Sequence, residues 1–107
     1  MTPRMALTYT TALILDALAR GHRYGFEIMD VTGLPSGTVY PALRRLEAFG
    51  HVASHWEDEA GATKEGRPAR RYYTLSAEGE TVLSTARRRF PALGRWDAAF
   101  GGEAAPA

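Results

Sequence analysis

The sequence predicts a mainly helical fold with one small β-hairpin. Apolar residues recur at helical spacing along much of the chain, whereas residues 52–57 and 70–75 have the alternation or the Tyr- and Thr-rich composition of strands. Gly and Pro separate these stretches, as expected for turns. The length of 107 residues fits a single small domain.

Two helices are expected in the first third of the chain. Residues 6–20 carry apolar side chains such as Ile14 and Leu18 at helical spacing, and a glycine follows as a natural cap. Residues 22–33 form a second, short helix, which ends at a glycine before a Leu-Pro turn. We expect both helices to contribute to the core.

A third helix is expected from Ser36, a plausible N-cap, to residue 49. Val39, Leu43 and Leu46 share one apolar face, and the opposite face carries small residues, hydroxyls and two arginines. Such a helix, following a helix and a tight turn, suits the DNA major groove, which is about 12 Å wide. An ordinary amphipathic surface helix is the alternative. The candidate DNA contacts here are Ser36, Thr38, Tyr40, Pro41, Arg44 and Arg45.

Pro41 conflicts with a regular helix that starts at Ser36. Proline has no N–H to donate to the carbonyl of Gly37 and its ring crowds that carbonyl. The first turn is therefore expected to be irregular, or the regular helix to begin nearer Tyr40.

The two expected strands form a hairpin, and residues 58–66 between them read as a polar, charged turn. A hairpin directly after a helix-turn-helix is a wing. Lys64, Arg67 and Arg70 are candidate contacts to phosphates or the minor groove. Arg71 could equally pair with the acidic group at residues 57–59.

Ser76 is expected to cap a last helix, which Pro91 kinks or breaks. Its apolar stripe exceeds what a small winged helix covers alone, so a homodimer is expected. The candidate interface residues are Leu7, Val82, Leu83, Ala86, Phe90 and Leu93. The chain then divides into a winged helix-turn-helix at 1–75, a C-terminal dimerisation helix at 76–100 and a disordered tail at 101–107.

Several functional classes are disfavoured. Cysteine is absent, and the three histidines have no metal-ligand spacing, so no metal site and no cofactor is expected. No nucleophile motif or phosphate loop is present, which makes an enzyme improbable. No apolar run approaches the ~20 residues of a membrane span, and a cytoplasmic protein is expected. With 13 basic and 12 acidic residues, net charge alone does not indicate nucleic acid, but the basic residues are grouped.

Three segments in order resemble the PadR family of bacterial winged-helix transcriptional regulators. They read HRYGFEI at 22–28, SGTVYPALRRLE at 36–47 and GRPARRYYTLS at 66–76. The resemblance implies a homodimer made by the C-terminal helix, with the wing beside the recognition helix. It also implies repression through an inverted repeat, released by a small molecule or another signal.

Two further hypotheses concern partners. Trp56, Trp96 and Phe100 are candidates for a pocket that binds a planar aromatic ligand, unless they only pack the dimer. A winged-helix protein-interaction module that never touches DNA is the rival to a DNA-binding repressor, because fold does not fix function.

Overall fold

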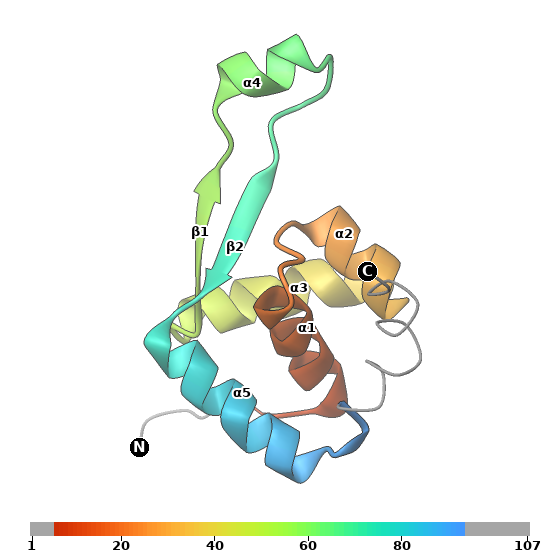
Figure 1. Cartoon of the computed structure of the whole chain (residues 1–107), viewed down its shortest axis with the longest axis vertical. Helices are drawn as coiled ribbons and strands as arrows, with labels where there is room; N and C mark the ends of the chain where they lie inside the picture. The colour runs from red at the N-terminus through yellow and green to blue at the C-terminus, as the bar shows by residue number, and fades with distance from the viewer. Residues whose placement is uncertain (1–5, 94–107) are drawn as a thin grey trace, which may run out of the picture.

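The computed structural model describes residues 6–93, which form five helices, two strands and the turns between them. Helices α1 (Tyr9–Ala19), α2 (Gly25–Thr32) and α3 (Ser36–Ala48) precede the hairpin. Strands β1 (Val52–Trp56) and β2 (Arg71–Leu75) enclose a short helix, α4 (Glu59–Lys64), and α5 (Ala77–Arg89) follows. The hairpin projects from a base of packed helices and carries α4 at its tip (Figure 1).

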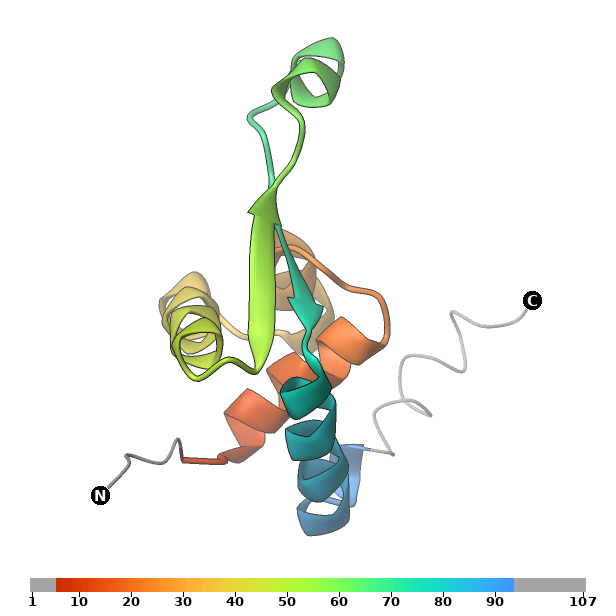
Figure 2. The same ribbon diagram turned by 90° about the vertical axis from the view of Figure 1, so that its left-hand side faces the viewer.

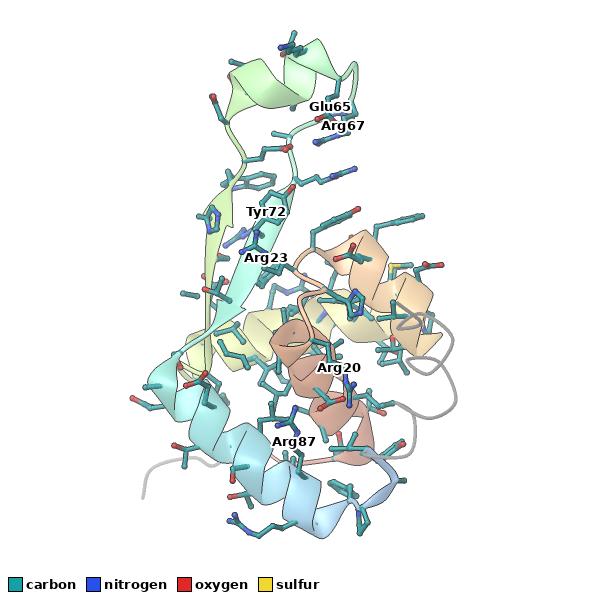
Figure 3. The ribbon with its side chains drawn as sticks, viewed as in Figure 1. Arg20, Arg23, Glu65, Arg67, Tyr72 and Arg87 are labelled. Carbon is teal, nitrogen blue, oxygen red and sulfur yellow. The ribbon has the colours of Figure 1, made fainter. Side chains whose placement is uncertain are left out.

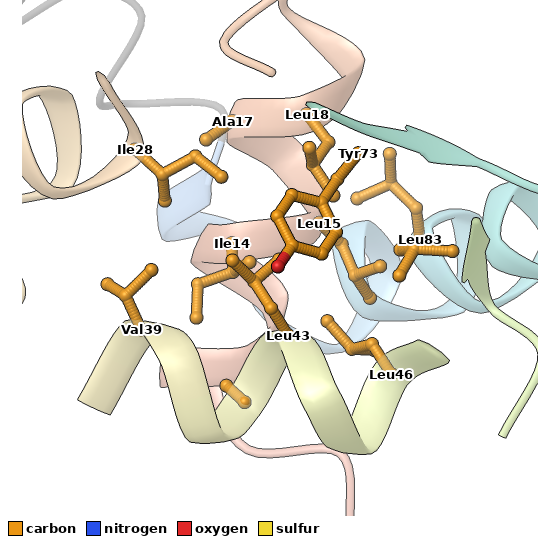
Figure 4. Packing of buried hydrophobic residues seen from close by; sticks show 12 residues of the cluster. Ile14, Leu15, Ala17, Leu18, Ile28, Val39, Leu43, Leu46, Tyr73 and Leu83 are labelled. Carbon is orange, nitrogen blue, oxygen red and sulfur yellow. The ribbon is translucent and has the colours of Figure 1, made fainter. Parts of the chain in front are cut away.

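The core lies where α1, α3 and the base of the hairpin meet. Tyr73 reaches from β2 into this cluster (Figure 4). The buried positions of the helices follow the helical spacing of apolar residues in the sequence. The core residues are Ile14, Leu15, Ala17, Leu18, Ile28, Val39, Ala42, Leu43, Leu46, Val52, Tyr73 and Leu83.

The helix starts are fixed by local hydrogen bonds. Thr8 caps α1, where its hydroxyl accepts from the N–H of Thr11 at 3.1 Å. Ser76 caps α5 as expected, accepting from the N–H of Gly79 at 3.0 Å. The expectation for α3 was wrong in one detail: Pro35 occupies the N-cap position and Ser36 is the first helical residue.

Pro41 lies inside α3, which runs without a break from residue 36 to residue 48. The helix therefore does not begin nearer Tyr40. The carbonyl of Gly37 loses its helical donor at Pro41. Gly37 is exposed, so water can take the place of that donor.

The hairpin is antiparallel, and Val52 pairs with Leu75, Ser54 with Tyr73 and Trp56 with Arg71. The connection between α1 and α2 runs along the outer edge of β2: Tyr24 bridges Tyr72, and the N–H of Tyr73 donates to the carbonyl of Arg23 at 2.7 Å. Residues 59–64 form a helix instead of the expected turn, because Asp58 caps it by accepting from the N–H of Ala60.

Helix α5 packs on α1, and this contact buries much of the apolar stripe of α5. Leu83 joins the main core, and Ala86 and Leu93 pack with Ala12 in a second cluster. The expectation that a small winged helix could not cover these three residues was wrong. Leu7, Val82 and Phe90 are partly buried, and Phe90 meets Tyr9 edge-to-face at 5.5 Å.

The start of α5 is in close contact with the turn that follows α3. The hydroxyl of Ser76 donates to the carbonyl of Gly50 at 2.6 Å, and the N–H of Ser76 donates to the carbonyl of His51 at 3.0 Å. A β-carbon on Gly79 would overlap the His51 carbonyl oxygen. Only glycine fits at this position without moving the backbone.

Candidate nucleic-acid interface

Helix α3 presents a polar face away from the core. Val39, Leu43 and Leu46 are fully buried, as the sequence predicts. On the opposite side Ser36, Tyr40, Arg44 and Arg45 are exposed, and Thr38 and Pro41 are partly exposed. In Figure 2, α3 lies to one side of the hairpin, and the hairpin rises past it. The C-terminal part of α3 contacts the hairpin, where Ser54 of β1 donates to Glu47.

Arg44 and Arg45 are the unpaired guanidiniums of this face. Within residues 6–93, neither makes an ion pair or a hydrogen bond to another side chain. By contrast, Arg67, Arg71 and Arg87 are each held by a carboxylate. Unpaired, exposed guanidiniums are available to phosphates or to base edges.

Tyr40 is 39% exposed, and its ring lies against the backbone at the start of α2. A β-carbon on Gly25 would lie only 2.5 Å from the Tyr40 hydroxyl oxygen. The absence of a side chain at Gly25 therefore determines where this hydroxyl sits. Sequence reasoning did not select Gly25, because nothing in the pattern shows which side chain it faces.

Three groups tie the end of α3 to the hairpin. The Ser54 hydroxyl donates to Glu47 at 2.6 Å, and Arg71 donates to the Ser54 hydroxyl at 2.8 Å and to Glu47 at 3.3 Å. Arg71 therefore pairs with an acid of α3 and not with the acidic group at residues 57–59, which was the alternative expectation. This contact fixes the angle between α3 and the hairpin.

Tyr73 lies beneath the same junction. Burial raises the pKa of its hydroxyl, Arg71 and Arg44 oppose that shift, and Glu47 and Tyr40 add to it. These charges come from both α3 and β2. Arg71, which the predicted set did not include, joins this junction through Glu47 and Ser54.

Arg67 is not free to bind a phosphate. It holds Glu57 through two hydrogen bonds: Nη1 donates to Oε1 at 2.5 Å and Nη2 donates to Oε2 at 2.8 Å. Its Nε donates to Glu65 at 3.1 Å. Glu65 and Arg67 lie together near the hairpin tip in Figure 3. The Arg67 bonds, with the N–H of Arg70, lower the pKa of Glu57 to about 2. The bond to Glu57 raises the pKa of Arg67.

The other expected wing contacts differ in setting. Lys64 is exposed at the end of α4, whereas Arg70 is partly buried with its guanidinium 4.3 Å from the ring centre of Tyr24. Residues 57–71 hold four acidic and four basic side chains, so the hairpin arm carries no net positive charge. The expectation of a basic wing therefore holds only locally.

A buried acid joins α1 to α5. Asp16 is fully buried and accepts from Arg20 at 2.6 Å and from Arg87 at 2.8 Å. Arg20 and Arg87 converge at this junction in Figure 3. Sequence reasoning did not select Asp16 or Arg87 as partners. The available signal was an aspartate within the apolar spacing of the first helix.

Comparisons with known proteins identify the family. The model of the transcriptional regulator PadR-like family matches residues 14–85. The chain belongs to this family. A crystal structure of a PadR family transcription regulator from Clostridium difficile is 26% identical with a TM-score of 0.68, covering 87% of this chain and 98% of that one. A transcriptional regulator from Clostridium thermocellum is 25% identical with a TM-score of 0.63, covering 86% of this chain and 89% of that one.

Bordetella bronchiseptica BpsR, whose DNA binding is regulated by 6-hydroxynicotinic acid, shares the fold at 22% identity and a TM-score of 0.65, covering 94% of this chain and 70% of that one. No curated protein matches this chain. The PadR-like family and its structural neighbours are transcription regulators, not enzymes.

The match to the PadR-like family includes α2, α3 and the hairpin, so every described element of the candidate interface lies inside it. Of the expected ligand pocket, Trp96 and Phe100 lie outside the described residues. Trp56, the third residue of that set, is 63% exposed at the end of β1.

Two other kinds of feature are absent from the part of this PadR-like chain that the structure describes. Within residues 6–93, no three His, Asp or Glu side chains lie close enough to hold a metal ion. None of the helices in that range has the length and apolar character that a membrane span requires.

Proposed function

We propose that this PadR-like protein binds double-stranded DNA sequence-specifically through the exposed face of α3. One observation carries the proposal: Arg44 and Arg45 are exposed and unpaired beside Tyr40 and Thr38, on a helix whose other face is buried. A helix of this kind enters the major groove, where arginine binds guanine in a bidentate manner and hydroxyls bind phosphates or bases.

The proposed contact set is Ser36, Thr38, Tyr40, Pro41, Arg44 and Arg45 on α3, with Lys64 and Arg70 on the hairpin arm. Arg67 joins this set only if a phosphate displaces Glu57 from its guanidinium. Pro41 contributes by apolar contact, since it has no N–H.

The protein acts, in this proposal, as a homodimeric repressor on an inverted repeat in the cytoplasm. The partly buried Leu7, Val82 and Phe90 are the apolar side chains left for a partner, together with the part of 76–100 outside the described residues. Two recognition helices must then match half-sites about 34–36 Å apart, or a multiple of that spacing. Sedimentation at micromolar concentration tests this, and a mass of one chain contradicts it.

A small planar aromatic ligand is proposed to release the DNA. BpsR supports this, because an aromatic acid regulates the DNA binding of a protein with the same fold. A ligand that prefers a different spacing of the two recognition helices lowers DNA affinity by the same factor, through linkage. Screening flat aromatic compounds for quenching of Trp96 and for release of DNA tests this step.

The decisive experiment is selection of bound duplexes from a random pool, with affinity then measured against salt. Affinity should fall steeply as salt rises, because bound phosphates release counterions. The second candidate function is a protein-interaction module, which the neutral charge of the hairpin arm favours. A protein with no duplex affinity at low salt supports that alternative.

A further inference from the structure

One large apolar side chain of the hairpin, Trp56, lies outside the core. Val52, Ser54 and Trp56 lie on the face of β1 that is turned toward α3, because successive residues of a strand alternate between faces. Along this row Val52 is buried, Ser54 binds Glu47 of α3, and Trp56 is 63% exposed. The row therefore extends past the core while still facing the side of the recognition helix.

The neighbour of Trp56 on that face is a cation. Arg71 is its cross-strand partner, and the Arg71 guanidinium lies 5.6 Å from the indole ring. Glu47 and Ser54 hold Arg71 in this position through its Nε and Nη2 atoms. Unlike Arg67, Arg71 keeps one nitrogen, Nη1, without a hydrogen bond within the described residues, and its side chain is 42% exposed. Arg44 of the adjacent helix α3 is exposed and makes no ion pair within the described residues.

We propose that Trp56 is a nucleic-acid contact: its ring packs on the sugar-phosphate backbone beside the groove that α3 occupies, while Arg71 faces a phosphate. The inference rests on the proposed function and deepens it. A fixed aromatic ring beside a fixed guanidinium suits the mixed apolar and anionic surface of that backbone. This assigns Trp56 to DNA and not to the effector pocket expected from the sequence.

Trp56 is neutral and Arg71 is charged, so the salt dependence of DNA binding distinguishes their contributions. Trp56→Ala removes apolar contact without charge, so it should weaken binding to every duplex about tenfold and leave the salt slope unchanged. Arg71→Gln should weaken binding and lower the salt slope by about one unit per lost contact on each half-site. Trp56→Phe should retain most of the affinity.

The matched control is His55→Ala, which removes an exposed ring from the opposite face of the same strand. Duplex affinity should not change. The variant Trp96→Phe leaves Trp56 as the sole tryptophan, and a saturating duplex should then protect its fluorescence from acrylamide.

The outcomes separate the two proposals. If the unaltered protein binds no duplex, the proposed function fails. If it binds with steep salt dependence while Trp56→Ala binds equally well and Trp56 stays open to acrylamide, only the present inference is overturned. It is also overturned if Trp56→Ala lowers the salt slope as Arg71→Gln does, because Trp56 would then act only by positioning Arg71. Protection of Trp56 with rising protein concentration, without DNA, would show that a second copy covers it.

Discussion

The hydroxyl of Tyr40 occupies space that a side chain on Gly25 would fill, with only 2.5 Å between that oxygen and a β-carbon on Gly25. The first residue of α2 and a residue in the second turn of α3 thus determine where one exposed hydroxyl lies. Because the overlapping atoms belong to the end of a side chain, Tyr40 can yield without unfolding the domain.

Gly25→Ala is therefore expected to displace Tyr40 and weaken DNA binding as much as Tyr40→Ala does. Alanine also favours helix over glycine by up to about 1 kcal/mol, so stability should fall little. In a double-mutant cycle, Gly25→Ala should cost no further affinity in the Tyr40→Ala protein. Gly61→Ala is the control, because a β-carbon there meets open space. Additive losses would show that Gly25 acts independently of Tyr40.

Arg44→Ala should weaken operator binding without changing the melting temperature, since Arg44 is exposed and unpaired within the described residues. A bidentate contact to guanine predicts a loss of about 1–3 kcal/mol and relaxed preference at one base pair. Contact to phosphate alone predicts equal weakening on all duplexes and a lower salt slope. Arg88→Ala, on α5, is the control. Unchanged affinity for Arg44→Ala places the recognition surface elsewhere.

Arg87→Ala should destabilise the fold. Asp16 is fully buried, and the variant removes the two hydrogen bonds that Arg87 donates to its Oδ1. Such losses cost about 1–3 kcal/mol, which urea unfolding would measure. The neighbouring Arg88 bonds only hydroxyls of its own helix, so Arg88→Ala should change stability by less than about 0.5 kcal/mol. Equal effects of both variants would mean that water replaces Arg87 at Asp16.

The hairpin arm should loosen in acid. The pKa of Glu57 is about 2 in the folded protein against an ordinary 4.5, so its bonds to Arg67 stabilise the arm fully above pH 4.5. That contribution is lost as the pH falls from 4.5 toward 2. Titration of the Glu57 carboxyl by NMR measures the midpoint.

Arg67→Gln should return this midpoint toward 4.5, because the Arg67 bonds are the largest cause of the lowered pKa. Lys64→Gln removes one positive charge, as Arg67→Gln does, but it leaves the partners of Glu57 in place. The titration midpoint of Glu57 should therefore stay low in this control. A normal midpoint in the unaltered protein contradicts the paired geometry.

The sequence was sufficient to predict the helices and strands in which apolar residues follow a regular spacing. Val39, Leu43 and Leu46 identified the buried side of α3, and Ser76 marked the start of α5. Helical spacing and a hydroxyl N-cap are both local signals, because each depends on residues only a few positions apart. A single sequence is therefore enough to locate the helices that they mark. The family resemblance was confirmed by the match over residues 14–85.

Long-range pairings were not predictable in the same way. Arg87 binds Asp16, which lies 71 positions earlier in the sequence. Arg71 pairs with Glu47, although the acids at residues 57–59 are closer to it in sequence. Each choice depends on the crossing of elements and not on local pattern. The helix at 59–64 was missed because a single capping aspartate decides between turn and helix there. The role of Gly25 is visible only once Tyr40 is placed.

The contact between Gly79 and the His51 carbonyl has a mechanical consequence. At this point the last helix has no side chain between its own backbone and the turn that joins α3 to β1. The hydrogen bonds of Ser76 close the same joint. A rotation of α5 cannot be absorbed there by side chains that change rotamer. A rotation of α5 would therefore move the end of α3 and the base of the hairpin together.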